Sequence, residues 1–172
     1  MEKKICGEIC PFIRRAKAED ASRIAEILVF TKRMNYRRIF HDDQVSFGEI
    51  QVYPLAKRYL DEPKRLEDIW VYDEGFVKAM IHMEGEQICE LYVDSFFEGE
   101  GIGGKLIEFA CGRGCRYLWV LKKNEGAIRF YERHHFIRSE EERLEEGTEE
   151  YLVKMVRMEK ECEEAGYAES LP

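Results

Sequence analysis

A glycine-rich segment in the middle of the chain constrains the fold most strongly. An apolar run at 91–93 leads into a loop, and the loop leads into a helix predicted at 105–112. Glycine allows a positive φ and lets a ligand approach the backbone, while a helix start offers unpaired N–H groups and a positive dipole end. The segment therefore predicts an anion site, typically for a phosphate or diphosphate. Its glycines are Gly99, Gly101, Gly103 and Gly104.

Two other phosphate-binding loops share parts of this glycine spacing but fit less well. A P-loop needs a hydroxyl for Mg²⁺ directly after its lysine, whereas Leu106 follows Lys105. In a dinucleotide-binding turn the glycines follow the strand closely, whereas residues 94–98 intervene here. The next predicted strand ends in Lys122 and Lys123 rather than in an acid that binds ribose. A nucleotide-binding module thus rests on glycine spacing alone, and a structural role for the glycines at helix contacts stays open.

A third loop fits both the segment and its surroundings. Residues 98–103, Glu-Gly-Glu-Gly-Ile-Gly, resemble the coenzyme A loop of the GNAT N-acetyltransferases, Gln/Arg-x-x-Gly-x-Gly/Ala. Residues 124–136 resemble the second motif of that family, Asn-x-x-Ala-x-x-Phe-Tyr-x-x-x-Gly-Phe. The two motifs stand in the family's order and are separated by one predicted strand. The residues that match the second motif are Asn124, Ala127, Phe130, Tyr131 and Phe136.

The sequence departs from the family pattern in a few places. Ser95 replaces a proline, and His135 replaces a glycine that ends the helix in a left-handed conformation. Histidine is among the residues enriched in that conformation, so we expect the helix end to survive. Glu98 replaces Gln or Arg beside the diphosphate, and Glu100 adds a second negative charge. These carboxylates are expected to weaken cofactor affinity without changing the cofactor.

The order of predicted elements indicates an α/β (α+β) fold. The expected structure is a mixed, mostly antiparallel central sheet flanked by helices, which resembles the acyl-CoA N-acyltransferase fold of the GNAT family. Asp20 is the expected N-cap of the first helix. The predicted strands are 12–15, 68–72, 76–83, 88–93, 117–121, one starting at 136, and 151–156. The predicted helices begin after residue 20 and span 52–60, 105–112 and 127–134. We expect one domain over 1–172, with its core at about 12–158 and peripheral tails at 1–10 and 159–172.

Composition limits the function. The chain has 172 residues and a net charge of −8, which argues against nucleic acid as a partner. No apolar run approaches the ~20 residues of a membrane span, and the N-terminus lacks the apolar core of a signal peptide. A cytoplasmic location with free thiols is therefore expected, and no zinc-site spacing accompanies the cysteines or histidines. The cysteines are Cys6, Cys10, Cys89, Cys111, Cys115 and Cys162.

The resemblance implies transfer of an acetyl group from acetyl-coenzyme A to a primary amine of a small molecule or peptide. Tyr131 matches the family's motif tyrosine, which implies that it protonates the departing thiolate. Glu90 is the candidate base, although a salt-bridged or solvated role is also open. The backbone at 91–93 is expected to pair with the pantetheine arm, and the Val93 amide to polarise the carbonyl. The full set of cofactor-binding candidates is Leu91, Tyr92, Val93, Glu98, Gly99, Glu100, Gly101, Ile102, Gly103, Gly104, Lys105, Asn124, Ala127 and Tyr131.

The acceptor is the least constrained part of the prediction. By resemblance it lies between segments 31–43 and 139–150, the second of which is strongly acidic. An acidic border favours a cationic amine. The alternatives are a carboxylate-bearing amine held by Arg33, Arg37 or Arg38, and a charged surface without a role in binding. A non-catalytic acyl-coenzyme A sensor on the same fold is the alternative function. No metal is predicted, and the sequence leaves open whether the chain forms a homodimer.

Overall fold

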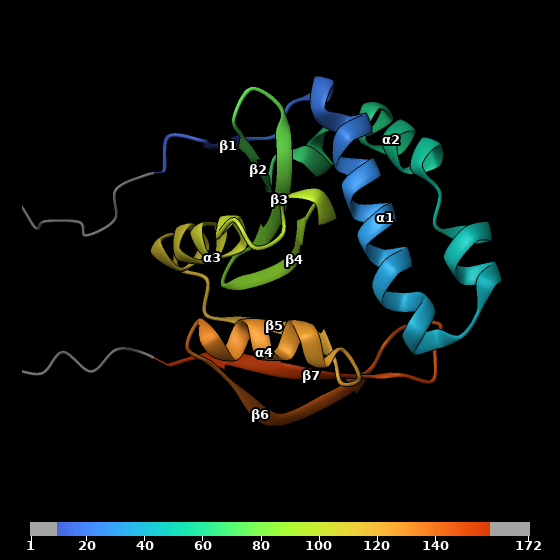
Figure 1. Cartoon of the computed structure of the whole chain (residues 1–172), viewed down its shortest axis with the longest axis vertical. Helices are drawn as coiled ribbons and strands as arrows, with labels where there is room; N and C mark the ends of the chain where they lie inside the picture. Colours follow the sequence, from blue (N-terminus) through green and yellow to red (C-terminus); the bar gives the residue numbers. More distant parts are fainter. Residues whose placement is uncertain (1–9, 159–172) are drawn as a thin grey trace, which may run out of the picture.

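A single seven-stranded sheet organises the computed structural model, which describes residues 10–158 (Figure 1). The strand order is β1-β2-β3-β4-β5-β7-β6. Among these strands β4 and β5 are parallel and all other neighbours are antiparallel. The predicted mixed, mostly antiparallel sheet is thus confirmed. The strands are β1 Ile13–Arg15, β2 Ile69–Asp73, β3 Val77–Glu84, β4 Gln87–Val93, β5 Tyr117–Leu121, β6 Phe136–Leu144 and β7 Tyr151–Arg157.

Helices cover both faces of the sheet, with α1 and α2 on one side of β2–β4 and α3 on the other (Figure 1). Ile24 and Ile27 of α1 are buried in one core cluster with Ile69 and Met80 of the sheet. The apolar residues of α1 that recur at helical spacing therefore form its buried side. The helices are α1 Ala21–Phe40, α2 Val52–Asp61, α3 Ile102–Gly112 and α4 Glu125–Arg133. Short 3₁₀ or π turns are Ala18–Asp20, Gln44–Glu49, Pro63–Leu66 and Ser95–Phe97.

The first helix is long enough to reach both halves of the sheet. Its C-terminal part packs through Ile39 on Leu121 of β5 and Leu152 of β7. Its N-terminal part packs on β2 and β3. The central residues of α1 therefore lie across the junction between β4 and β5.

That junction is where the sheet opens. The parallel pairing of β4 with β5 is limited to Gln87↔Tyr117 and Ile88↔Leu118. Beyond Ile88, β4 continues to pair with β3 but not with β5. One edge of β4 therefore keeps backbone groups that no neighbouring strand uses.

The structure corrects two local expectations and confirms a third. Asp20 does not cap α1 with its side chain; its carboxylate instead accepts from the Arg14 guanidinium at 2.7 Å and from the Lys17 amide at 2.8 Å. Helix α3 begins at Ile102, three residues earlier than predicted. His135 has a φ of 66°, which confirms the expected left-handed helix end.

The expected tails at 1–10 and 159–172 lie outside the described residues, apart from Cys10. The described cysteines, Cys10, Cys89, Cys111 and Cys115, are free. Within 10–158 no helix is long and apolar enough to cross a membrane.

Candidate active site

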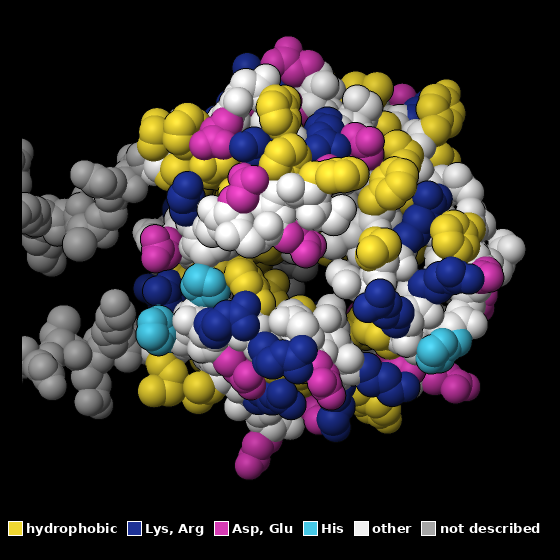
Figure 2. All heavy atoms as spheres, in the orientation of Figure 1, with side chains coloured by type: hydrophobic (Ala, Val, Ile, Leu, Met, Phe, Trp, Pro, Cys, Tyr) yellow, Lys and Arg dark blue, Asp and Glu magenta, His cyan; other side chains and the backbone are white. Residues whose placement is uncertain are grey.

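A cleft of about 960 Å³ occupies the opening between β4 and β5. Figure 2 shows this face of the molecule hollowed between the half that carries α3 and the half that carries α4. Residues from α1, β4, α3, β5, α4 and the β6–β7 connection line it. All sequence-predicted catalytic and cofactor-binding residues lie on its wall except Glu100, which is not among the lining residues. The fold thus brings motifs that are distant in the sequence into one cavity.

The glycine loop forms one end of the cleft. Gly99 and Gly101 have φ values of 84° and 77°, which a side chain at either position would disfavour. Gly101 is the N-cap residue of α3 and offers no side-chain cap. The first intrahelical bond runs from the Lys105 amide to the Gly101 carbonyl at 3.2 Å. The preceding amides of the first turn therefore lack carbonyl partners within the helix and are suited to an anion.

Gly103 and Gly104 serve a different purpose, because neither of them has a positive φ. A Cβ at Gly103 would lie 3.0 Å from the Phe130 ring, and one at Gly104 would lie 2.9 Å from the His134 ring. Both glycines therefore allow α3 to approach α4 closely. The structural role left open by the sequence holds for these two glycines, although both also line the cleft.

The charges around the loop are mixed. Glu98 lines the cleft, whereas Glu100 lies 3.7 Å from the Lys78 ammonium. The Lys105 ammonium donates to the Tyr72 hydroxyl at 3.1 Å. Arg133 of α4 also lines the cleft, and Figure 2 shows Lys and Arg side chains gathered on the α4 side of the hollow. The α4 side therefore offers cations that oppose the repulsion from Glu98.

Tyr131 lies on α4 and is buried at the wall of the cleft. Its ring stacks edge-on with Phe130 at 5.2 Å and with Phe136 at 5.9 Å. Burial raises the pKa of Tyr131 well above its ordinary value, and the nearby Tyr36 adds to that increase. The phenol is therefore protonated throughout the neutral range and is able to act as a proton donor. The Asn124 side chain caps α4 by accepting from the Ala127 amide at 3.2 Å.

Glu90 is held in an ion pair. The Lys32 ammonium of α1 donates to its Oε1 at 3.1 Å, and each side chain is 23% exposed. Burial lowers the pKa of Lys32, but Glu90 and Tyr36 outweigh burial and leave it raised. Of the two roles open for Glu90, the salt bridge is present in this structure. Proton transfer by Glu90 would have to occur beside a lysine cation.

Several side chains of the cleft lie in the two segments that the sequence placed beside the acceptor, 31–43 and 139–150, but were given no role individually. Lys32 and Tyr36 project from α1, while Arg143 and Glu145 come from the end of β6 and the turn after it. The Arg143 guanidinium stacks on the ring of Trp119 at 4.4 Å. These residues belong to no motif. For Lys32 and Tyr36, the available signal in the sequence was their spacing of four residues, which places both on the same side of a helix.

The arginines suggested for a carboxylate-bearing acceptor lie elsewhere. Arg33 donates to the carbonyls of Ser46 and Ile50 at 2.9 and 2.8 Å. Arg37 pairs with Asp43 at 2.9 Å. None of Arg33, Arg37 and Arg38 lines the cleft.

Comparison with known proteins agrees with this geometry. The family model of the GNAT acetyltransferase domain matches residues 65–138. An uncharacterised N-acetyltransferase of Methanocaldococcus jannaschii is 44% identical over 70 residues, which are 37% of this chain and 31% of that protein. The matched part thus spans about a third of that relative's length. Residues 65–138 thus match a GNAT acetyltransferase domain, and the matches together indicate a GNAT family N-acetyltransferase.

Solved structures show the same fold at low sequence identity. The apo form of YjaB from Escherichia coli has a TM-score of 0.70 and 19% identity, covering 84% of this chain and 95% of that one. The PaiA N-acetyltransferase from Thermoplasma acidophilum, in complex with coenzyme A, has a TM-score of 0.63 and 16% identity. That match covers 84% of this chain and 97% of the other. The GNAT-like acyl-CoA N-acyltransferase fold predicted from the sequence is confirmed.

Proposed function

We propose that the chain forms one acetyltransferase domain that transfers an acetyl group from acetyl-coenzyme A to a primary amine of a small molecule or peptide. One observation carries the proposal. A single cleft joins the anion-binding start of α3 to Tyr131 and Glu90 along the unpaired edge of β4. A cofactor with a diphosphate at one end and a thioester at the other matches this arrangement.

The residues of the cleft fit the parts of acetyl-coenzyme A. The amides at the start of α3 would hold the diphosphate, and the positive φ of Gly99 and Gly101 brings the backbone within reach. The free edge of β4 at 91–93 would pair with the pantetheine arm as an added strand does. The Asp94 amide donates to Lys78 of β3 at 2.9 Å. Successive N–H groups of a strand point to opposite edges, so the Val93 amide faces the cleft and would polarise the thioester carbonyl.

Acyl transfer makes two demands on protons. The attacking ammonium, with an ordinary pKa of about 10, must lose a proton before its nitrogen attacks the carbonyl carbon. Glu90 is the candidate acceptor of that proton. When the carbon–sulfur bond breaks, the thiolate takes a proton, and the buried phenol of Tyr131 is the candidate donor. The phenol is protonated at neutral pH, as the donor role requires, while burial raises its pKa and makes it a weaker acid than a free phenol.

A second function is favoured by one observation. The carboxylate proposed as base is paired with the Lys32 ammonium at 3.1 Å. A chain whose base is neutralised in this way would bind acyl-coenzyme A as a sensor without transferring the acyl group.

Acetyl-coenzyme A turnover with a panel of amines distinguishes the acetyltransferase from the sensor. The panel would contain polyamines, amino acids and short peptides with free N-termini or lysines, and thiol release would be the readout. We expect turnover with at least one amine. A chain that binds coenzyme A by calorimetry but releases no thiol with any amine would support the sensor instead.

A further inference from the structure

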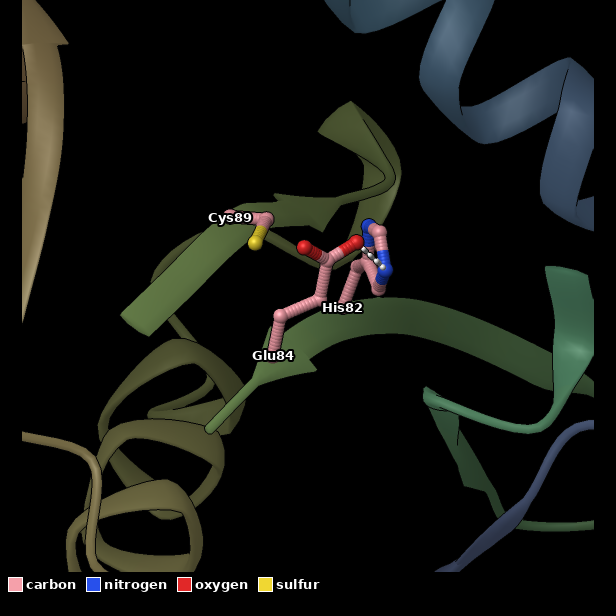
Figure 3. Close-up of side chains that lie close together, drawn as sticks. All are labelled: His82, Glu84 and Cys89. Carbon is pink, nitrogen blue, oxygen red and sulfur yellow. Dashed lines mark ion pairs between the residues drawn. The ribbon is translucent and has the colours of Figure 1, made fainter. Parts of the chain in front are cut away.

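Three different metal-ligating side chains converge at the end of the β3–β4 hairpin (Figure 3). His82 and Glu84 come from β3 and Cys89 from β4, and their ligand atoms all lie within 4.8 Å of one another. His82 Nε2 is 3.2 Å from Glu84 Oε1. Glu84 is largely exposed, while His82 and Cys89 are partly buried. The group is therefore anchored on two strands and open to solvent on one side.

A β-bulge creates this convergence. The register runs His82↔Glu90 and then Met83↔Ile88, so Cys89 is an extra residue without a partner on β3. In an unbroken register Cys89 would oppose Met83, and its side chain would face away from His82 and Glu84. The bulge turns the thiol towards them, and bulges commonly re-aim side chains at functional positions.

We propose that His82, Glu84 and Cys89 form a binding site for a zinc-like divalent transition metal ion. An imidazole nitrogen, a thiolate and a carboxylate together suit Zn²⁺, whereas Mg²⁺ and Ca²⁺ take oxygen ligands. Two ligands on a tetrahedral ion at ~2.0 Å are separated by about 3.3 Å, which the His82–Glu84 distance of 3.2 Å already satisfies. Binding forms a metal–sulfur bond and releases the Cys89 thiol proton to solvent. Solvent would fill the remaining position.

The surroundings of His82 support the same assignment. Its Nδ1 lies 3.9 Å from Glu90 Oε2, on the side opposite the Glu84 contact. A carboxylate beside the second ring nitrogen is a common way to orient a histidine that binds metal. This arrangement differs from an isolated surface ion pair, because both ring nitrogens face acidic groups and a sulfur completes the set.

Titration of the purified, metal-free full chain with Co²⁺ alone tests the proposal without relying on transferase activity. We expect one equivalent to bind with a sulfur-to-cobalt charge-transfer absorption, and Zn²⁺ to displace it. Cys89→Ser should abolish that absorption. Loss of an outer-shell partner alone commonly weakens metal binding about 10- to 100-fold. Loss of a direct ligand should weaken it at least as much, so we expect His82→Gln and Glu84→Gln each to weaken binding at least tenfold.

Two matched variants control for other thiols and acids. Cys10→Ser removes a described cysteine away from the site, and Glu86→Gln removes an exposed carboxylate from the same hairpin. Both should leave the absorption and the affinity unchanged. Far-UV circular dichroism would establish that each variant is folded. Absence of saturable one-equivalent binding, or a charge-transfer band that persists in folded Cys89→Ser, would overturn the proposal.

Discussion

The two ends of the cleft, which we propose to hold the cofactor and the acceptor and call the cofactor end and the acceptor end, are built in different ways. The cofactor end consists mainly of backbone amides and glycines from one continuous stretch, which runs from β4 through α3 to α4. The acceptor end consists of charged and aromatic side chains from α1, from the end of β6 and from the turn after it, such as Lys32, Tyr36, Arg143 and Glu145. The geometry of the cofactor end depends on backbone conformation and on the close approach of α3 to α4. The properties of the acceptor end depend on side-chain charge and on how elements distant in the sequence pack together.

This contrast has a physical consequence. A backbone amide binds an anion whatever side chain it carries, so only positions that need a positive φ or close packing are fixed in residue type. The acceptor end has no such requirement, and different side chains there would select different amines on the same scaffold.

Tyr131→Phe should have the largest effect. Phenylalanine fills the same buried space, so the fold and the affinity for acetyl-coenzyme A should be kept. A positioned general acid contributes about 10²- to 10⁴-fold, and we expect kcat to fall within that range. Steady-state kinetics measures the change, with Tyr53→Phe as a control at a tyrosine that is 76% exposed. A kcat that stays within twofold of the parent would remove Tyr131 from the chemistry.

Glu90→Gln tests the base and the ion pair together. We expect kcat to fall about 10²-fold. The change also leaves the partly buried Lys32 without its counter-ion, which should lower the free energy of unfolding by about 1–3 kcal/mol. Burial lowers the pKa of Lys32, but the charge of Glu90 raises it by more. The pKa of Lys32 should therefore fall when Glu90 is replaced by glutamine.

Lys32→Met and the double variant separate the two roles. In Lys32→Met the carboxylate is kept, so transfer should persist if Glu90 is the base. In the double variant the unpaired lysine is gone, and stability should recover relative to Glu90→Gln alone. Denaturant unfolding measures the stability of each variant, and steady-state kinetics on the same samples measures kcat. Equal loss of kcat in both single variants would indicate that the intact ion pair, rather than the base alone, is needed.

Gly101→Ala should act on the cofactor end alone. The residue has a φ of 77°, and an L-residue in the left-handed region costs roughly 1–2 kcal/mol. We expect about a tenfold loss of coenzyme A affinity by calorimetry. Gly112→Ala is the matched control, since Gly112 ends α3 without a positive φ and a Cβ there would meet nothing within 4 Å. Unchanged affinity in folded Gly101→Ala would place the diphosphate away from this loop.

The cofactor end was largely predictable from sequence because its requirements are local. The positive φ of Gly99 and Gly101 follows from their place at a strand–helix turn, and the left-handed His135 follows from its place after α4. The strands and most helix ends were also predictable, since apolar periodicity fixes them. The role of Gly103 could not be settled from the sequence, because its contact with Phe130 arises from how α3 and α4 pack.

The acceptor end was predictable only as two flanking segments. Arg33 and Arg37 were candidate ligands by charge, yet their guanidinium groups bind Ser46, Ile50 and Asp43. Those partners are set by the turn after α1, which has no strong sequence signal. The bulge at Cys89 is equally hidden, because it depends on the register between two strands. At this end of the cleft, long-range contacts and strand register thus limited the prediction.

Glu145→Gln should have a smaller effect, at the acceptor end. Glu145 lines the cleft, whereas Glu146 next to it is exposed and does not. The negative charge should favour cationic amines, so kcat/KM for a polyamine should fall about threefold at low salt and less at high salt. Glu146→Gln should leave it unchanged. Faster transfer to a matched amine bearing a carboxylate, with that preference lost in Arg143→Ala, would contradict a cationic acceptor.

Glu98→Gln should have the smallest effect and act on the cofactor end. Glu98 lines the cleft near the proposed diphosphate position, so removing its charge should strengthen coenzyme A binding about two- to threefold at low salt. Glu100→Gln is the matched control, because that carboxylate lies 3.7 Å from Lys78 and outside the cleft lining. Calorimetry at two ionic strengths measures both. If both variants strengthen binding equally, the effect reports net charge over the whole surface. If neither does, Glu98 points away from the phosphates and the cofactor end is governed by backbone conformation alone.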